Sequence, residues 1–171
     1  MLGLINPLQD VDGLTAGSEF DAATPMAINW LLTGYGVDLA SKKVAVVGSR
    51  GRLVGAPLLE MFKNSSVDVT GFDVEDADRL GEELPQFNVI ISATGSPRII
   101  ASDMVKKGAV VVDAGTASEG GVLVGDVAED VRERADISIT PVRGGVGPVT
   151  VAALFDNVIS SARRRIENSQ G

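Results

Sequence analysis

Short apolar runs alternate along this chain with longer segments in which apolar residues recur every three or four positions. The runs are rich in valine and isoleucine, and this composition predicts buried strands. They lie at Lys43–Val47, Val67–Phe72, Asn88–Ala93, Ala109–Val112 and Ile137–Ile139. The periodic segments predict helices from Pro25 to about Gly34 or Gly36, and at Leu53–Lys63, Asp76–Glu83, Ser102–Lys106, Asp126–Arg134 and Pro148–Arg165. Strands that alternate with helices form a mostly parallel sheet covered on both faces, so the pattern predicts a doubly wound α/β domain of about five strands.

Composition excludes several classes of function. Aromatic residues make up 4% of the 171 residues and the net charge is −8, so a nucleic-acid partner is not expected, because nucleic acids favour basic surfaces with stacking aromatics. The chain has no cysteine and no histidine, which removes disulfides, the usual metal ligands and the commonest general base. No apolar run approaches the roughly 18 residues that span a membrane, and no signal peptide is visible. We therefore expect a cytoplasmic protein with no metal and no membrane contact.

A glycine-rich segment follows the first predicted strand. Gly48 ends the apolar run, Gly51 lies in the polar loop after it, and Gly55 stands near the start of the next predicted helix. This order suits a backbone that approaches a phosphate closely and then points a helix N-terminus at it, so it predicts a dinucleotide. The spacing differs from G-x-G-x-x-G, and a tight turn without a ligand is the alternative. The candidate cofactor-binding residues here are Gly48, Ser49, Arg50, Gly51, Arg52, Val54 and Gly55.

The choice between NAD and NADP is open from the residues. Asp73 ends the second predicted strand, where an acidic residue accepts hydrogen bonds from the adenosine ribose and favours NAD. Arg50 and Arg52 indicate the opposite choice, because a guanidinium can hold the 2′-phosphate of NADP. A solvated turn residue is the alternative interpretation of Asp73, and exposed residues at a helix start are the alternative for the two arginines.

Polar and glycine-rich residues also follow the later predicted strands. Thr94 and Gly95 are candidates for the nicotinamide half of the site, and Asp113 either caps its strand or belongs to the site. Residues 144–148 form a predicted nest of backbone N–H groups that suits a polar or anionic group. Ordinary turns are the alternatives. Because ligands of doubly wound sheets bind beyond the carboxyl ends of the strands, these residues together predict a site at that edge.

Six segments taken together resemble one family. They are Asp10–Leu14 (DVDGL), Ala23–Ile28 (ATPMAI), Val46–Pro57, Val111–Gly115 (VVDAG), Val124–Val127 (VGDV) and Thr140–Ala152 (TPVRGGVGPVTVA). In this order and spacing they are similar to the bifunctional methylenetetrahydrofolate dehydrogenase/methenyltetrahydrofolate cyclohydrolase, over almost the whole chain. The most specific parts are the DVDG start and the GGVGPxTVA finish.

The resemblance covers only the C-terminal NAD(P)-binding domain of that family, which implies a Rossmann-like fold. Residues 1–22 would be a lead-in from an N-terminal folate-binding domain, and residues 23–171 would form the NAD(P)-binding domain. The family's catalytic tyrosine and lysine lie in the folate-binding domain, so no catalytic residue is expected in this chain. The chain alone is expected to lack cyclohydrolase activity and to be at best feebly active as a dehydrogenase.

The resemblance also implies residue roles. Asp12 would hydrogen-bond the pterin of the folate, and Gly147 would shape the contact between folate and nicotinamide through its backbone. Gly48, Ser49, Arg50 and Arg52 would face the nucleotide phosphates. Thr116 would lie near the nicotinamide. The implied reaction belongs to one-carbon metabolism and transfers hydride from the folate methylene to NADP, or to NAD because of Asp73. The family is commonly dimeric through this domain, so a homodimer is implied.

Two other functions stay open at this stage. One is a stand-alone module that binds a nucleotide or docks a partner without catalysis, because the catalytic domain has no counterpart here. The other is a dehydrogenase of a different kind, acting for example on shikimate or amino acids. The GGVGPxTVA segment disfavours the second of these.

Overall fold

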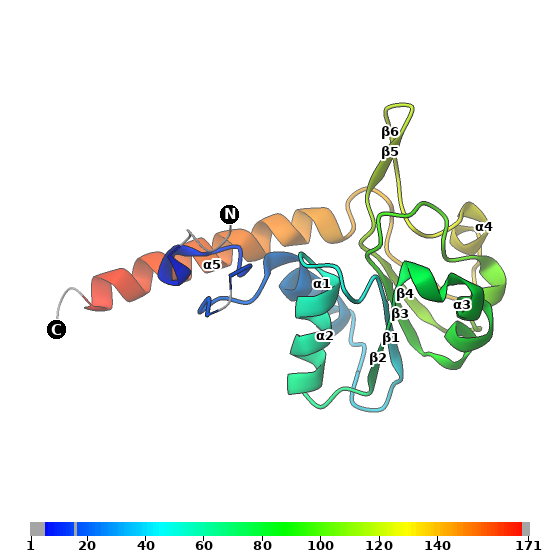
Figure 1. Ribbon diagram of the computed structural model, residues 1–171, viewed down its shortest axis with the longest axis horizontal. Helices are drawn as coiled ribbons and strands as arrows, with labels where there is room; N and C mark the ends of the chain where they lie inside the picture. Colours follow the sequence, from blue (N-terminus) through cyan, green and yellow to red (C-terminus); the bar gives the residue numbers. More distant parts are fainter. Residues whose placement is uncertain (1–5, 16, 169–171) are drawn as a thin grey trace.

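The computed structural model describes residues 6–15 and 17–168, and its centre is a five-stranded sheet. The strands are β1 (Val44–Val47), β2 (Val69–Phe72), β3 (Val89–Ser92), β4 (Val110–Asp113) and β7 (Ser138–Ile139). Their order is β2-β1-β3-β4-β7, and every neighbouring pair is parallel (Figure 1). The predicted doubly wound, mostly parallel fold is confirmed, and each predicted strand lies in this sheet.

Helices cover both faces of the sheet, as Figure 1 shows. They are α1 (Ala23–Gly34), α2 (Gly55–Asn64), α3 (Ala77–Glu83), α4 (Glu129–Arg132) and α5 (Val146–Asn168), and short 3₁₀ turns lie at η2 (Pro7–Gln9), η3 (Val74–Asp76), η4 (Leu84–Gln86) and η5 (Ser102–Met104). Successive side chains of a strand point to opposite faces. Val44 and Val46 of β1 therefore pack with α1, α2 and α5, while Ala45 and Val47 pack with α3 and α4. Because β1 is buried on both faces, its sequence is a continuous apolar run.

The strand register places the carboxyl ends of the strands at one edge. Val47 lies beside Phe72 on one side and Ser92 on the other, and Ser92 lies beside Asp113. The chain runs from β1 outward to β2 and then returns to β3 on the opposite side of β1. Loops that leave such a reversal point diverge and open a crevice, which is where ligands of this fold bind.

The helix α5 extends well beyond the sheet, and the lead-in runs beside it (Figure 1). The buried side-chain amide of Asn157 donates to the carbonyl oxygens of Val11 at 2.8 Å and Asp21 at 3.0 Å. α5 also packs on α1. The lead-in, the first long helix and the last helix therefore form one unit.

The structure contains a hairpin between β4 and α4 that the sequence analysis did not predict. Strands β5 (Ala117–Glu119) and β6 (Val122–Val124) pair antiparallel and project from the sheet (Figure 1). Gly120 and Gly121 join them with φ of +57° and +81°. Two positive φ angles give the turn whose twist matches a tight hairpin, so the glycine pair is the signal that identifies it.

The predicted helix at 126–134 is wrong over its first part, since only Glu129–Arg132 is helical. The N–H groups of Asp126 and Val127 donate instead to the Asp113 carboxylate at 3.1 and 3.2 Å. The Asp126 carbonyl, which in a helix would accept from a later N–H, accepts from the Ile100 N–H at 3.1 Å, and the Ala128 N–H donates to the Ile100 carbonyl at 2.9 Å. This pairing with Ile100 holds the start of the segment extended.

Other helix boundaries shift by small amounts. α2 begins at Gly55 rather than at Leu53, because the residues before it complete the turn after β1. α5 begins at Val146 rather than at Pro148, so Gly147 belongs to its first turn.

The predicted division into a lead-in at 1–22 and a domain at 23–171 remains a prediction. Residues 1–5 and 16 of the lead-in, and residues 169–171 at the other end, lie outside the described residues. Among the described residues, no helix combines the length and the apolar character that crossing a membrane requires.

Candidate dinucleotide site

The loop after β1 folds tightly against neighbouring backbone. Gly48 has a φ of +89°, and its N–H donates to the Phe72 carbonyl at 2.8 Å. A Cβ on Gly48 would lie 2.6 Å from the Ala93 carbonyl oxygen, and a Cβ on Gly55 would lie 1.9 Å from the Gly48 carbonyl oxygen. Only glycine fits such close approaches. The start of α2 therefore packs directly on the end of β1, which is the close helix–strand packing that glycine provides in dinucleotide-binding loops.

Asp73 ties this loop to the end of β2. Its Oδ2 accepts hydrogen bonds from the Ser49 hydroxyl at 2.8 Å and from Arg50 Nε at 2.9 Å, and its Oδ1 accepts one from the Arg50 backbone N–H at 3.0 Å. Burial alone would raise the pKa of Asp73, but these donors outweigh it and lower the pKa. The side chain is 15% exposed, so Asp73 is a charged anchor of the loop rather than a solvated turn residue.

The guanidinium of Arg50 is exposed but fixed in direction. Arg50 Nη2 donates to Glu75 at 2.5 Å in addition to the Asp73 contact, and the side chain is 68% exposed. The hydrogen bond to Asp73 and the charges of Asp73 and Glu75 raise the pKa of Arg50. The contacts with Asp73 and Glu75 hold the Arg50 side chain beside the end of β2. In this fold the adenosine ribose binds at that place. That position fits a guanidinium that contacts a 2′-phosphate.

Thr94, which follows β3 and precedes Gly95, is hydrogen-bonded to a buried carboxylate. Oδ2 of Asp126 accepts hydrogen bonds from the Thr94 N–H at 2.6 Å and from the Thr94 hydroxyl at 2.9 Å. The carbonyl oxygen of the exposed Thr116 lies 3.9 Å from the position that a Cβ on Gly95 would take. The residues predicted to face the nicotinamide therefore come from two adjoining loops.

Asp113, at the end of β4, lies in a buried network. Its carboxylate accepts hydrogen bonds from the backbone N–H groups of Asp126 and Val127 and forms an ion pair with Arg132. Burial raises the pKa of Asp113, and the two N–H groups and the guanidinium oppose that rise. The Thr140 hydroxyl accepts from the Asp113 N–H at 2.9 Å. Asp113 thus links the ends of β4 and β7 from below the surface.

The remaining predicted residues lie on three segments. Gly51 closes the loop after β1, where its N–H donates to the Gly48 carbonyl at 2.9 Å. The exposed Arg52 follows it, and Val54 directly precedes α2. Gly147 is exposed in the first turn of α5, and Asp12 is exposed on the lead-in. The predicted cofactor residues gather on adjoining strand-end loops, while Asp12 lies on a separate segment.

Sequence reasoning gave no role to Asp126, Arg132 or Asn157. Asp126 is fully buried and Asn157 is 4% exposed. Their partners lie on other elements of the fold, 8 residues away or more, so their roles have no local pattern. The only available signal was the position of Asp126 in the VGDV segment and the position of Asn157 on the helix that follows GGVGP.

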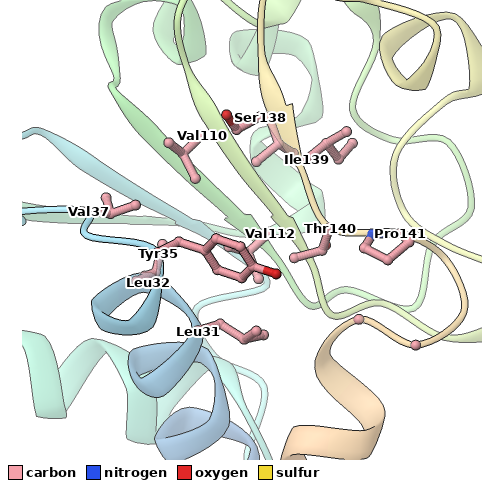
Figure 2. A pocket seen from close by; sticks show the side chains of 13 residues that line it. Leu31, Leu32, Tyr35, Val37, Val110, Val112, Ser138, Ile139, Thr140 and Pro141 are labelled. Atoms are coloured by element: carbon pink, nitrogen blue, oxygen red, sulfur yellow. The ribbon is translucent and has the colours of Figure 1, made fainter.

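A cavity of about 430 Å³ opens between the end of α1, the face of β4 and β7, and the turn before α5 (Figure 2). Its lining is mainly apolar, and Tyr35 of the α1 end lies between helix and sheet. Of the segments predicted to meet a ligand, the nest at 144–148 contributes Gly144 and Gly145 to its lining, and no residue of the loops after β1, β2 and β3 lines it.

The reversal of strand order, the close-packed glycine loop and the anchored Arg50 define a dinucleotide-binding domain of the doubly wound class. Sequence comparison gives the family. The model of the tetrahydrofolate dehydrogenase/cyclohydrolase NAD(P)-binding domain matches residues 22–166, and the chain belongs to this family. The resemblance found in the sequence and the predicted NAD(P)-binding domain are confirmed, and a dehydrogenase of a different family is excluded.

Similar proteins agree with this assignment. The bifunctional protein FolD of Aquifex aeolicus is 43% identical over 94% of this chain and 58% of its own length, and that of Desulforamulus reducens is 42% identical over 95% and 60%. The crystal structure of FolD from Campylobacter jejuni superposes with a TM-score of 0.86 at 36% identity, over 96% of this chain and 61% of that one. The Trypanosoma brucei enzyme, complexed with NADP cofactor and inhibitor, gives 0.85 at 31% identity, over 96% and 62%. The chain thus spans about three fifths of these relatives (58–62%).

Proposed function

We propose that this chain is the NAD(P)-binding part of a 5,10-methylenetetrahydrofolate dehydrogenase/5,10-methenyltetrahydrofolate cyclohydrolase and that it prefers NADP. The observation that carries the proposal is the loop from Gly48 to Gly55, anchored by Asp73 at the reversal point of the sheet. It occurs in a chain whose family binds NAD(P) with this domain.

The residues present fit a dinucleotide. At Gly48 and Gly55 the backbone leaves no room for a Cβ, so the loop turns tightly and α2 starts directly on the end of β1, where its N-terminus can receive the phosphates. Arg50 supports the 2′-phosphate, and Thr94, Gly95 and Thr116 are assigned to the nicotinamide side. The bound cofactor supplies the hydride acceptor. The task of the protein is to orient the two reactants and exclude water.

The substrate side needs a folate-binding partner domain. Asp12 and Gly147 are the residues assigned to the folate. Exposed apolar side chains on α5, at Val151, Phe155 and Ile159, offer a surface that such a domain would cover. The proposal includes a cytoplasmic homodimer, supported by the exposed Val122 and Leu123 on the projecting hairpin.

A reconstitution experiment tests the proposed reaction. The folate-binding part of the Aquifex aeolicus relative is fused in front of this chain, and NADPH formation from 5,10-methylenetetrahydrofolate is followed by absorbance. We expect turnover by the fusion and none by either part alone, because the reactants are held together only when both parts are present. An Asp12→Ala fusion is expected to lose most of this turnover. A fusion that binds NADP⁺ but shows no turnover would favour the stand-alone binding module.

Titration calorimetry tests the cofactor choice. We expect NADP⁺ to bind this chain at least tenfold more tightly than NAD⁺, since the proposal assigns the 2′-phosphate to Arg50, which Asp73 and Glu75 hold beside the end of β2. Arg50→Gln should remove most of this difference and leave NAD⁺ affinity within about twofold. Arg79→Gln is the matched control, because Arg79 is also exposed and paired with two carboxylates but lies on α3. Tighter binding of NAD⁺ by the unmodified chain would assign the ribose to Asp73 instead.

A further inference from the structure

One buried carboxylate lies beneath the loop that follows β3. Asp126 is fully buried, and its Oδ2 accepts three hydrogen bonds. The donors are the Ser92 hydroxyl at 2.8 Å, the Thr94 N–H at 2.6 Å and the Thr94 hydroxyl at 2.9 Å. The Thr94 hydroxyl in turn accepts from the Ser96 N–H at 2.9 Å. The path of this loop is therefore set by Asp126.

The same carboxylate also supports the loop after β4. A Cβ on Gly115 would lie 2.0 Å from both Cγ and Oδ1 of Asp126. The Gly115 backbone therefore rests directly on the carboxyl group, one residue before Thr116. Among the described residues, Oδ1 of Asp126 has no hydrogen-bond donor. Such an oxygen is unfavourable in a buried position, so the carboxylate is better explained by its effect on the two loops than by its own stability.

The backbone of Asp126 is held by residues at the ends of β4 and β7. Its backbone N–H donates to Oδ1 of Asp113 at 3.1 Å, and Asp113 is ion-paired with Arg132. Arg132 Nη1 donates to the Thr140 carbonyl at 3.1 Å. Asp113 and Thr140 lie at the ends of β4 and β7. The two strands therefore fix the position of the Asp126 carboxyl group.

The strand order assigns these loops to one half of the ligand. A dinucleotide crosses the carboxyl edge at the reversal between β1 and β3. Asp73 and Arg50 lie on the β2 side, which receives the adenosine half. The loops that Asp126 supports follow β3 and β4, and they lie on the side that receives the nicotinamide half.

We propose that Asp126 is a positioning residue that sets residues 94–96 and 115–116 as one platform for the nicotinamide half of the cofactor. This inference rests on the proposed function. Asp126 does not touch the ligand, because it is fully buried. It acts through the Thr94 and Gly115 backbone. Affinity for the nicotinamide half should therefore depend on Asp126, and affinity for the adenosine half should not.

Calorimetric titration with a dinucleotide and with its adenosine half tests this role. The probes are NADP⁺ and 2′,5′-ADP, and the variants are Asp126→Ala, Asp126→Asn and Gly115→Ala. We expect Asp126→Ala to weaken NADP⁺ binding at least tenfold and to leave 2′,5′-ADP binding within about twofold. Asp126→Asn should restore most of the affinity, because its amide oxygen can still accept from Ser92 and Thr94. Gly115→Ala should also weaken NADP⁺ binding, because the added methyl group would displace the Asp126 carboxyl group from the side of the loop after β4.

Asp103→Ala is the control, because Asp103 is an exposed carboxylate on η5. An equal loss of both ligands in the folded variants would assign Asp126 a structural role only and overturn the proposal, as would unchanged NADP⁺ binding. If Asp126→Ala does not fold, Gly115→Ala decides by the same two titrations. Failure of the unmodified chain to bind either probe would be a failure of the proposed function itself, which separates the two results.

Discussion

Arg132→Met is expected to lower the free energy of unfolding by about 3–5 kcal/mol, because removal of one partner leaves a buried charge uncompensated. The side chains of Arg132 and Asp113 are 11% and 2% exposed, and the ion pair joins α4 to the end of β4. Arg132 also donates to the Thr140 carbonyl, and this hydrogen bond is lost as well. Urea unfolding followed by circular dichroism measures the change.

The loss should depend on pH with a definite sign. Burial raises the pKa of Asp113, and without Arg132 less opposes that rise. A buried carboxyl group with a raised pKa costs the least stability when it is protonated and neutral. The loss of stability relative to the unmodified chain should therefore be smaller near about pH 5 than near about pH 8. Arg79→Met, which breaks exposed pairs with Asp76 and Glu83, should lose less than about 1 kcal/mol. Similar losses in the two variants would contradict the importance of the buried pair.

Gly55→Ala is expected to abolish measurable dinucleotide binding, a loss of about a hundredfold or more. Its methyl group would lie 1.9 Å from the Gly48 carbonyl oxygen, so α2 must move away from the end of β1. The N–H groups that would hold the phosphates move with the helix start, and a hundredfold loss of affinity corresponds to about 2.7 kcal/mol. Overpacking should also destabilise the fold by about 1–3 kcal/mol. Titration with NADP⁺ and urea unfolding measure the two effects.

Gly81→Ala is the matched control for this substitution. Gly81 lies inside α3, and a Cβ there meets nothing within 4 Å. Alanine is favoured over glycine in a helix interior, so this variant should be more stable by roughly 0.5–1 kcal/mol. If Gly55→Ala bound NADP⁺ as tightly as Gly81→Ala does, dinucleotide binding would not require the close approach of the loop and α2.

The sheet was predictable because its strands are buried on both faces. β1 and β3 are buried throughout, and such strands appear in sequence as unbroken apolar runs. β2 is less regular, since Thr70 and Gly71 are exposed and the strand begins at Val69 rather than at Val67. The loop from Gly48 to Gly55 was also predictable, because close approach of backbones requires glycine at fixed points along the chain.

The buried polar network could not be predicted in the same way. Asp126 follows a glycine and precedes an acidic segment, which is a helix signal in a local window. Its actual partners, Ser92 and Thr94, lie 34 and 32 residues away. The amide of Asn157 bonds to Val11 over 146 residues. Contacts of this kind depend on the tertiary fold, and no periodicity along the chain records them.

The packing of α1 on α5 affects how the chain folds during synthesis. The buried face of α1 includes Ala27, Ile28 and Leu32, and it shares a core with Ala153 of α5. α1 ends at Gly34 and α5 begins at Val146, so the ribosome adds more than a hundred residues before the partner helix appears. At roughly 5–20 residues per second, the part of this face that packs on α5 stays uncovered for on the order of ten seconds, while β1 and α2 cover the rest earlier. A nascent chain in that interval is a natural client for chaperones, and early termination before α5 would leave a product prone to aggregation.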